Sequence, residues 1–248
     1  MAGSESARHF ELKRLALTWA LTAGYSAAAT EVALPQMRFR LDVAAYRPAR
    51  RGREAVLGTT ALFECKQERG DFLRDARKSA PLLARLERLH ARKTRLEAVL
   101  RVVHPTLRTG DSLFPEYESH DYARSGDELY LKVLAQIAAA RGQLYAQTKF
   151  EKLRHWQAAN LHYAVTEPGV LRVHELPDGW GLLVRAGEAL ELAAEPCWHE
   201  IPDHHRLNVL HRIAVAGTRA VGRSFAPTDS ATLHTPRTSV CSADLQDV

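Results

Sequence analysis

The sequence has few cysteines and no long apolar run. Its three cysteines, Cys65, Cys197 and Cys241, are odd in number and form no CxxC pair. Such usage argues against a disulfide framework or a structural zinc site and is typical of a reducing compartment. No stretch reaches the ~20 apolar residues of a membrane span, and no secretory pattern opens the chain. We therefore expect a cytoplasmic chain with no membrane partner.

The charge bias is modest. The 248 residues carry a formal net charge of +5, and 46% of them are hydrophobic. A chain of this length can bury one sizeable core and still carry an inserted element. The composition is compatible with a polyanionic partner but does not identify one.

Three segments show the two-residue alternation of a β-strand, and each carries acidic residues. Glu31 lies in TEVAL, Asp42 in RFRLDVAAY, and Glu64 with Lys66 in ALFECKQ. In the second segment one face is predicted to hold Phe39, Leu41, Val43 and Ala45, and the other Arg40, Asp42 and Ala44. In the third, Ala61, Phe63 and Cys65 alternate with Leu62, Glu64 and Lys66. The pattern predicts carboxylates and one lysine gathered on the non-core face of neighbouring strands.

These residue types fit metal-dependent hydrolysis of a phosphodiester. Mg²⁺ takes oxygen ligands, commonly one or two carboxylates with water or phosphate. Asp42 and Glu64 would bind Mg²⁺ or Mn²⁺, with the Cys65 carbonyl as a third ligand, and Lys66 would orient the attacking water. Glu31 is predicted to complete the acidic set, although Glu11 on the opening helix is an alternative. Each residue also has a plainer interpretation, since Glu64 and Lys66 fit an exposed pair on an edge strand.

The spacing of Asp42 and the E64-x-K66 motif resembles the PD-(D/E)xK nuclease superfamily. The continuation from Glu64 to Lys78, with its DF-x-x-D-x-K run, is similar to the MmcB-like DNA repair family. The resemblance covers roughly residues 8–78 and 152–193, and the proline of the family name is replaced by Leu41. It implies an α/β fold with a restriction-endonuclease-like αβββαβ core, a mixed central sheet, and a DNA substrate.

Basic residues gather in three places that we predict to contact nucleic acid. A solvated surface is the simpler alternative for each. The predicted contacts are Arg47, Arg50, Arg51 and Arg53 between the strands of Asp42 and Glu64, Lys78 after the ExK strand, and Lys149 and Lys152 further on.

The remaining elements follow from periodicity and turn residues. We expect an opening helix over 7–23 and a helix that starts at about residue 71 and is interrupted near Pro81. From there an apolar seam over 82–103 predicts a long helix. Two more helices are expected over 127–159 and near 207–221. Two further strands are expected over 161–165 and 181–184. Residues of about 79–151 are predicted to form an antiparallel helical hairpin inserted in a nuclease domain of residues 1–222, and residues 223–248 are predicted to be disordered.

The sequence therefore predicts a metal-dependent deoxyribonuclease of DNA repair or processing. The alternative is a non-catalytic nucleic-acid-binding scaffold with a vestigial site, which recruits a repair protein through the helical arm. The sequence leaves open the choice between DNA, RNA and branched substrates, the choice between endonuclease and exonuclease action, and the oligomeric state.

Overall fold

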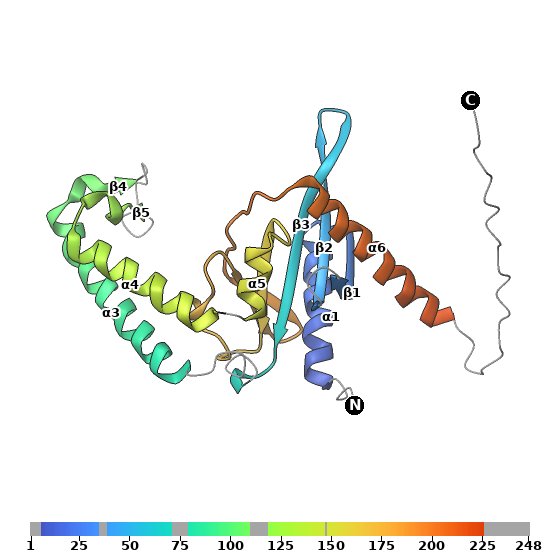
Figure 1. Cartoon of the computed structure of the whole chain (residues 1–248), viewed down its shortest axis with the longest axis horizontal. Helices are drawn as coiled ribbons and strands as arrows, with labels where there is room; N and C mark the ends of the chain where they lie inside the picture. Colours follow the sequence, from blue (N-terminus) through green and yellow to red (C-terminus); the bar gives the residue numbers. More distant parts are fainter. Residues whose placement is uncertain (1–5, 35–38, 71–78, 110–118, 147, 226–248) are drawn as a thin grey trace, which may run out of the picture.

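The chain folds around a six-stranded mixed sheet with helices on both faces (Figure 1). This computed structural model describes residues 6–34, 39–70, 79–109, 119–146 and 148–225. The strands of the sheet are β1 (Ala27–Leu34), β2 (Phe39–Arg51), β3 (Glu54–Lys66), β6 (Leu161–Thr166), β7 (Gly181–Ala186) and β8 (Ala189–Ala194). A separate two-stranded ladder joins β4 (Arg108–Thr109) and β5 (Ser119–His120).

The described residues form five α-helices and three short 3-10 helices. The α-helices are α1 (Ala7–Thr22), α3 (Ser79–Val103), α4 (Glu128–Tyr145), α5 (Lys149–His155) and α6 (Asp203–Phe225). The 3-10 helices are η2 (Pro105–Leu107), η4 (Tyr122–Ser125) and η5 (Val173–Glu175). No described helix is long and apolar enough to cross a membrane.

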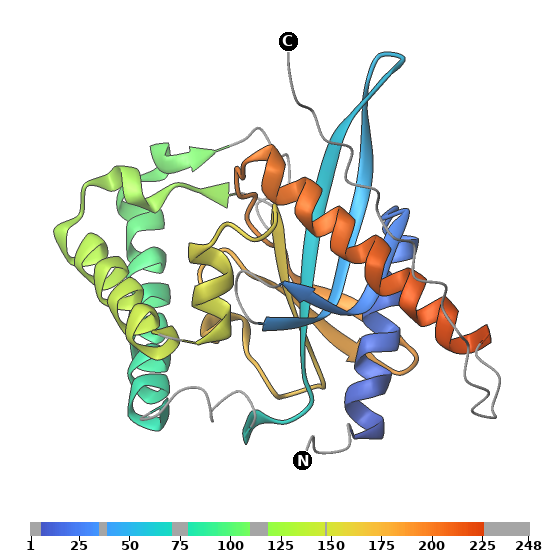
Figure 2. The same ribbon diagram turned by 45° about the vertical axis from the view of Figure 1, so that its right-hand side comes forward.

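The sheet has the order β1-β2-β3-β6-β7-β8. The β3–β6 and β6–β7 pairs are parallel, and the other three pairs are antiparallel. The predicted α/β class with a mixed sheet is therefore confirmed. The sheet edge at β1 lies beside α6, and the long β2–β3 hairpin projects beyond the other elements (Figure 2).

Each face of the sheet has its own apolar core. Helix α1 covers one face, where Trp19 packs against the stacked rings of Phe63 and Tyr163. Helices α5 and α6 cover the other face, with Phe150 against Trp180, and the α3–α4 pair contributes side chains to the same core. Because both faces are buried, the expectation that Asp42 and Glu64 lie on a non-core face is wrong.

The helical arm consists of α3 and α4, which pack against each other as the apolar seam predicts. Pro81 lies in the first turn of α3, where its missing N–H leaves no helical hydrogen bond unmade. The predicted interruption therefore does not occur within α3. The helix predicted from residue 71 and Lys78 lie outside the described residues.

Two predicted helix boundaries are wrong. The helix expected over 127–159 is two helices, because Thr148 caps a new one by accepting a hydrogen bond from the Glu151 N–H. Helix α5 consequently packs on the sheet and not in the arm. Helix α6 continues to Phe225, so residues 223–225 are helical where disorder was expected. Residues 226–248 lie outside the described residues.

Candidate functional site

The predicted carboxylates meet where β2 and β3 separate. The antiparallel pairing of these strands ends with Val43 opposite Phe63, so the next pair in register would be Asp42 and Glu64. There the Asp42 side chain takes the place of a backbone acceptor, since its Oδ2 accepts a hydrogen bond of 2.8 Å from the Cys65 N–H. The side chain of Asp42 thereby fixes the point at which the two strands diverge.

Glu31 lies opposite Asp42 on β1. Thr30 pairs with Val43 and Val32 with Leu41, while Glu31 between them has a φ of 56°. A non-glycine residue in the left-handed region costs on the order of 1–3 kcal/mol and is enriched at functional sites.

This irregular backbone overturns the predicted alternation of β2. Leu41 packs in the same core as Ala44 and Leu62, whereas Val43 and Ala45 pack in the core under α1. Residues 41 and 43 therefore face opposite layers, because regular pairing is interrupted on both sides of Asp42. The alternation predicted for β3 holds, with Phe63 and Cys65 in one core and Leu62 in the other.

Two side chains from α1 reach the Asp42 side of the site. His9 Nε2 lies 3.2 Å and Lys13 Nζ 3.7 Å from Asp42 Oδ1. Lys13 also forms an ion pair with Glu31, whose other oxygen lies 3.2 Å from Arg40 Nη1. The four-residue spacing of His9 and Lys13 places both on one face of α1. Glu31 is thus linked to Asp42 through Lys13, whereas Glu11 pairs with Arg14 on the same helix.

Two lysines contact Glu64, one from helix α5 and one from β3 itself. Lys149, the first residue of α5, donates to Glu64 Oε2 and to the Arg40 carbonyl, each over 2.6 Å. Lys66 Nζ lies 3.4 Å from Glu64 Oε1 and 5.7 Å from the centre of the Phe150 ring. The predicted Glu64 and Lys66 pair therefore exists as a contact, with a second ammonium on the other carboxylate oxygen.

The two central carboxyl groups have opposite pKa shifts. Burial on its own raises the pKa of Asp42, but the His9 hydrogen bond, the Lys149 charge and the Cys65 N–H lower it below its ordinary value. Burial and the negative charge of Asp42 raise the pKa of Glu64, and Lys149 and Lys66 only partly compensate. Their charges therefore interact, although 22 residues separate the two along the chain.

The Cys65 thiol is unsuited to act as a ligand or nucleophile. Burial raises its pKa well above the ordinary value, and the Asp42 and Glu64 charges raise it further. Its side chain lies in the core under α1, so its backbone is the part that faces the carboxylates.

Among the described residues, no group of three or more His, Cys, Asp or Glu side chains could hold a metal ion. The donors present are two carboxylates and one neighbouring backbone segment, which are hard oxygen ligands. Such a set fits Mg²⁺, which binds through one or two carboxylates and keeps several waters. It does not fit a cage made of protein side chains alone.

Most of the predicted basic contacts lie elsewhere. The guanidinium of Arg47 lies 5.0 Å above the Tyr25 ring. Arg51 is nine residues from Asp42 along β2, about 30 Å at ~3.3 Å per residue, so the tip of the hairpin projects far from the carboxylates. Arg50 and Arg53 share this tip, and Lys152 is exposed on α5. Among the predicted contacts that the structure describes, Lys149 alone enters the site.

Sequence reasoning missed His9 and Lys13. The sequence signal that could have identified Lys13 is its position between Leu12 and Leu15, two apolar residues on the buried side of α1. In the structure Lys13 is only 6% exposed. A lysine is rarely buried without a partner. The pattern could have identified a buried pair but not its acidic partners, which depend on how α1 crosses the sheet.

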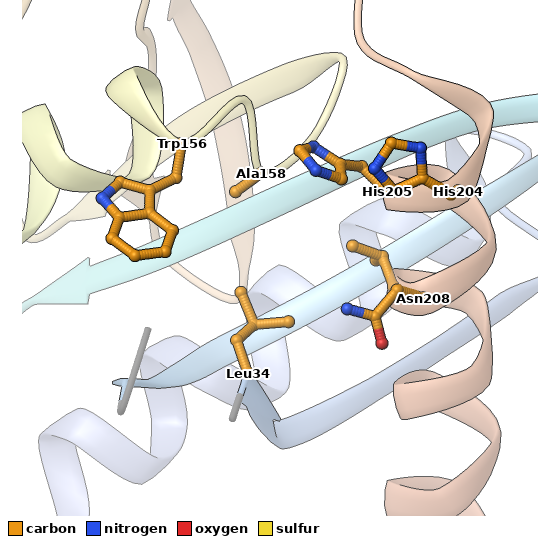
Figure 3. Close-up of a pocket in the computed structure, with 7 residues that line it drawn as sticks. Leu34, Trp156, Ala158, His204, His205 and Asn208 are labelled. Carbon is orange, nitrogen blue, oxygen red and sulfur yellow. The ribbon is translucent and has the colours of Figure 1, made fainter. Parts of the chain in front are cut away.

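An open cleft leads into the site from the α1 side. Its volume is about 760 Å³, and it is lined by Ser6, His9, Lys13, Glu31, Arg40, Gln67 and Arg223. A smaller hollow of about 140 Å³ adjoins it between β1 and α6 and shares Glu31, Arg40 and Arg223. A third hollow, of about 220 Å³, lies between the end of β1, the end of α5 and the start of α6 (Figure 3).

Comparisons with known proteins extend only to the fold. No protein-family model matches the sequence, and no curated protein matches it either. The structure is similar to that of a protein of unknown function from Silicibacter pomeroyi, with a TM-score of 0.50 and 12% sequence identity over 93% of this chain and 100% of that one. At this sequence identity the similarity shows a shared fold and nothing about function.

Proposed function

We propose that this protein is a divalent-metal-dependent nuclease that hydrolyses phosphodiester bonds in DNA. One observation carries the proposal. Asp42 and Glu64 are both buried, at 9% and 4% exposure, and they interact at the point where two central strands separate. Buried charges are costly unless they are paired or bind a metal, so a fold that holds two of them together is expected to use them.

The oxygen donors suit a hard cation. Asp42 and Glu64 would hold Mg²⁺ or Mn²⁺, which would lower the pKa of a bound water and offset charge on the phosphate. Because a residue on a strand directs its N–H and C=O to the same neighbour, the Cys65 carbonyl is expected to face Asp42 as its N–H does. This supports Cys65 as a third ligand through its backbone.

The surrounding cations have separable roles. Lys66 contacts Glu64 and would orient the attacking water and stabilise negative charge at the phosphorus oxygens. Lys149 contacts Glu64 and His9 contacts Asp42, from opposite layers of the fold. Lys13 holds Glu31 beside Asp42, so Glu31 would act by positioning Lys13.

The order of elements supports the resemblance to the PD-(D/E)xK superfamily. Helix α1 is followed by β1, β2 and β3, and α5 and β6 then return to the same sheet. The α3–α4 pair interrupts this αβββαβ order between β3 and α5. A role in DNA repair or processing is inferred from the resemblance to the MmcB-like family.

A binding scaffold with a vestigial site is the second candidate. It is favoured by the ion pairs themselves, because Glu64 is contacted by Lys149 and Lys66, and Asp42 by Lys13 and His9. A site neutralised by its own cations can persist as a structural network without binding metal.

A cleavage assay distinguishes the two candidates. Purified full-length protein is incubated with single-stranded, duplex, nicked and flapped DNA in Mg²⁺, Mn²⁺ or chelator. The nuclease proposal expects cleavage of at least one substrate only with metal, and loss of that cleavage in Asp42→Asn, Glu64→Gln and Lys66→Gln. Removing one group aimed at a transition state typically costs about 10²–10³ in rate.

The matched controls are Glu191→Gln on β8 and Lys132→Gln on α4. Both side chains are exposed, and neither belongs to the site. Nucleic-acid binding without cleavage by the wild type would favour the scaffold. Cleavage that survives the Asp42 and Glu64 substitutions in folded protein would reject the catalytic assignment.

A further inference from the structure

Three hollows follow one another along α6 and the edge strand β1. The first hollow contacts α6 within residues 204–209. The second hollow contacts the helix at Arg212, Val215, Ala216 and Arg219. Arg223 lines both the second and the third hollow. On β1 the order runs from Leu34 in the first hollow to Glu31 in the other two. The second and third hollows share lining residues, and the first is next along both elements, so the three lie in a line that ends at Lys13 and His9 beside Asp42. We refer to it as the α6 groove.

The α6 groove is strongly basic. After Asp203, helix α6 contains no acidic residue, whereas Arg206, Arg212, Arg219 and Arg223 lie along it. Arg212, Arg219 and Arg223 line the hollow against β1, and their spacings of seven and four residues place them on one helix face. Within the described part of the chain, none of these three forms an ion pair with a carboxylate, and Arg212 Nε is buried without a hydrogen-bond partner.

Arg40 adds a cation on the opposite wall. Its side chain is 69% exposed, and it is the neighbour of Glu31 in both the second and third hollows. Glu31 is already shared between Lys13 and Arg40. The groove thus offers several guanidinium groups and little acidic charge to balance them, which is the arrangement that binds phosphate groups.

The far end of the α6 groove offers an aromatic surface. Figure 3 shows the Trp156 ring at one side of the hollow and His204, His205 and Asn208 of α6 at the other, with Leu34 below. Trp156 is 47% exposed. An exposed indole beside a basic groove is the combination that binds unpaired bases by stacking while cations follow the backbone.

We propose that the α6 groove binds a single strand of nucleic acid, with its phosphates on Arg212, Arg219 and Arg223 and a base on Trp156, and leads it to the Asp42–Glu64 site. Arg212 and Arg223 are eleven residues apart, about 16 Å along the helix, so the arginines can contact successive phosphates of one strand. The inference deepens the proposed nuclease function, because it names the strand and the route by which it reaches the carboxylates.

The groove differs from the basic surfaces predicted from the sequence. Arg50, Arg51 and Arg53 lie at the tip of the β2–β3 hairpin, far from the carboxylates, whereas Arg223 and Arg40 share a cleft with Lys13 and His9. A substrate held at the hairpin tip would have to span that distance to reach Asp42. A strand in the α6 groove enters the site directly.

The test measures binding by the full-length protein in chelator, where cleavage cannot occur. The probes are fluorescein-labelled oligo-dT, oligo-rU and a matched DNA duplex, each titrated over a series of KCl concentrations. A plot of log affinity for oligo-dT against log salt has a negative slope. In Arg219→Gln/Arg223→Gln this slope should become shallower by about 1.4, because each lost phosphate contact removes ~0.7. Oligo-dT should be bound more tightly than the duplex, and oligo-rU shows whether the groove also accepts RNA.

Trp156→Ala tests the stacking end of the groove. Loss of one base–aromatic contact should weaken oligo-dT binding about fivefold or more, with the salt slope unchanged. Trp156→Phe should restore most of the affinity, because phenylalanine keeps a stacking face. Trp198→Ala is the control, since Trp198 is 49% exposed and lines a different pocket.

Arg50→Gln/Arg53→Gln is the charge control for the arginines, because it removes the same number of exposed cations outside the groove. The groove assignment is overturned if the α6 variants, folded by circular dichroism, bind as the wild type does. It is also overturned if the hairpin control alone lowers the salt slope, if wild type binds no oligonucleotide, or if polyglutamate competes as well as oligo-dT. None of these outcomes depends on cleavage, so the nuclease proposal and the groove can fail separately.

Discussion

Asp42 and Glu64 experience nearly the same surroundings, yet their pKa values move in opposite directions. Asp42 receives a hydrogen bond from Cys65 and from His9, so its charged form is stabilised. Glu64 is more deeply buried and has the Asp42 charge beside it, so its neutral form is favoured. A bound divalent cation would reverse the second effect, because its positive charge would hold both groups ionised.

His162 is expected to make the stability of the protein sensitive to acid. It is fully buried between Trp180 and His199, and neither ring nitrogen has a hydrogen-bond partner among the described residues. Burial, followed by electrostatic repulsion from His199 and Arg154, lowers its pKa from 6.5 to about 3. Between these two pH values His162 is therefore protonated in the unfolded state and neutral in the folded state.

The sign of the effect on stability follows directly. Because the folded pKa is lowered, the contribution of neutral His162 is complete above 6.5 and is lost as pH falls toward 3. His162→Leu should remove a slope of about 1.4 kcal/mol per pH unit from the acid side of the stability curve. Urea unfolding at a series of pH values measures this, with exposed His211→Gln as control. Equal slopes for His162→Leu and wild type would contradict it.

At the scale of elements, the β2–β3 hairpin depends on one glycine. A Cβ on Gly58 would lie 1.9 Å from the Arg47 carbonyl oxygen, at the point where the pairing of β2 and β3 shifts register. Gly58→Ala should destabilise the protein by about 1–3 kcal/mol or more, because the obstacle is backbone and cannot rotate away. Denaturant unfolding measures the change.

Gly217 provides the matched comparison. It lies inside α6, and a Cβ there would meet nothing within 4 Å. Gly217→Ala should stabilise the protein by about 0.5–1 kcal/mol through helix propensity. A destabilised Gly217→Ala, or a neutral Gly58→Ala, would show that the surroundings of these glycines differ from those described.

The base of the helical arm is held by Glu175 of η5. Its carboxylate accepts two hydrogen bonds from Arg69 after β3, at 2.6 and 2.9 Å, and one from the Arg172 N–H. Its carbonyl accepts a hydrogen bond from the Tyr145 hydroxyl at the end of α4. Glu175 therefore joins the exit of β3, the end of the arm and the segment before β7.

Glu175→Ala should destabilise the fold by about 2–3 kcal/mol, less than a fully buried pair because Arg69 remains partly exposed. The measurement is again denaturant unfolding. Glu191→Ala, an exposed carboxylate on β8, should change stability by no more than about 0.5 kcal/mol. Similar losses in both variants would remove Glu175 from this role.

At the scale of the whole molecule, metal binding should be visible as stability. A ligand that binds only the folded state at 100 times its Kd stabilises it by about 2.7 kcal/mol. Mg²⁺ or Mn²⁺ should therefore raise the Tm of wild type and of Glu191→Gln. The same ions should not change the Tm of Asp42→Asn or of Glu64→Gln. An increase of equal size in all four proteins would indicate metal bound outside the proposed site.

Two predictions about the elements failed for physical reasons. The break between α4 and α5 at Thr148 was missed because the apolar spacing continues through it, while the cap stabilises a new helix direction. The face assignment of β2 was wrong because alternation describes regular pairing, and pairing is interrupted beside Asp42. The proposed roles of Asp42, Glu64 and Lys66 remain predictions until they are measured.

The sequence by itself determined the features that depend on neighbouring residues, namely the faces of β3 and the packed helices of the arm. Strand periodicity placed Glu64 and Lys66 on one face of β3, and helix periodicity predicted the packed α3–α4 arm. Only the tertiary structure decided that Lys13 reaches Asp42, that Lys149 reaches Glu64, and that Arg223 of α6 lines the same cleft as Lys13. Those contacts join segments up to about 200 residues apart, and their geometry is set by how α1, α5 and α6 cross the sheet, which no local pattern encodes.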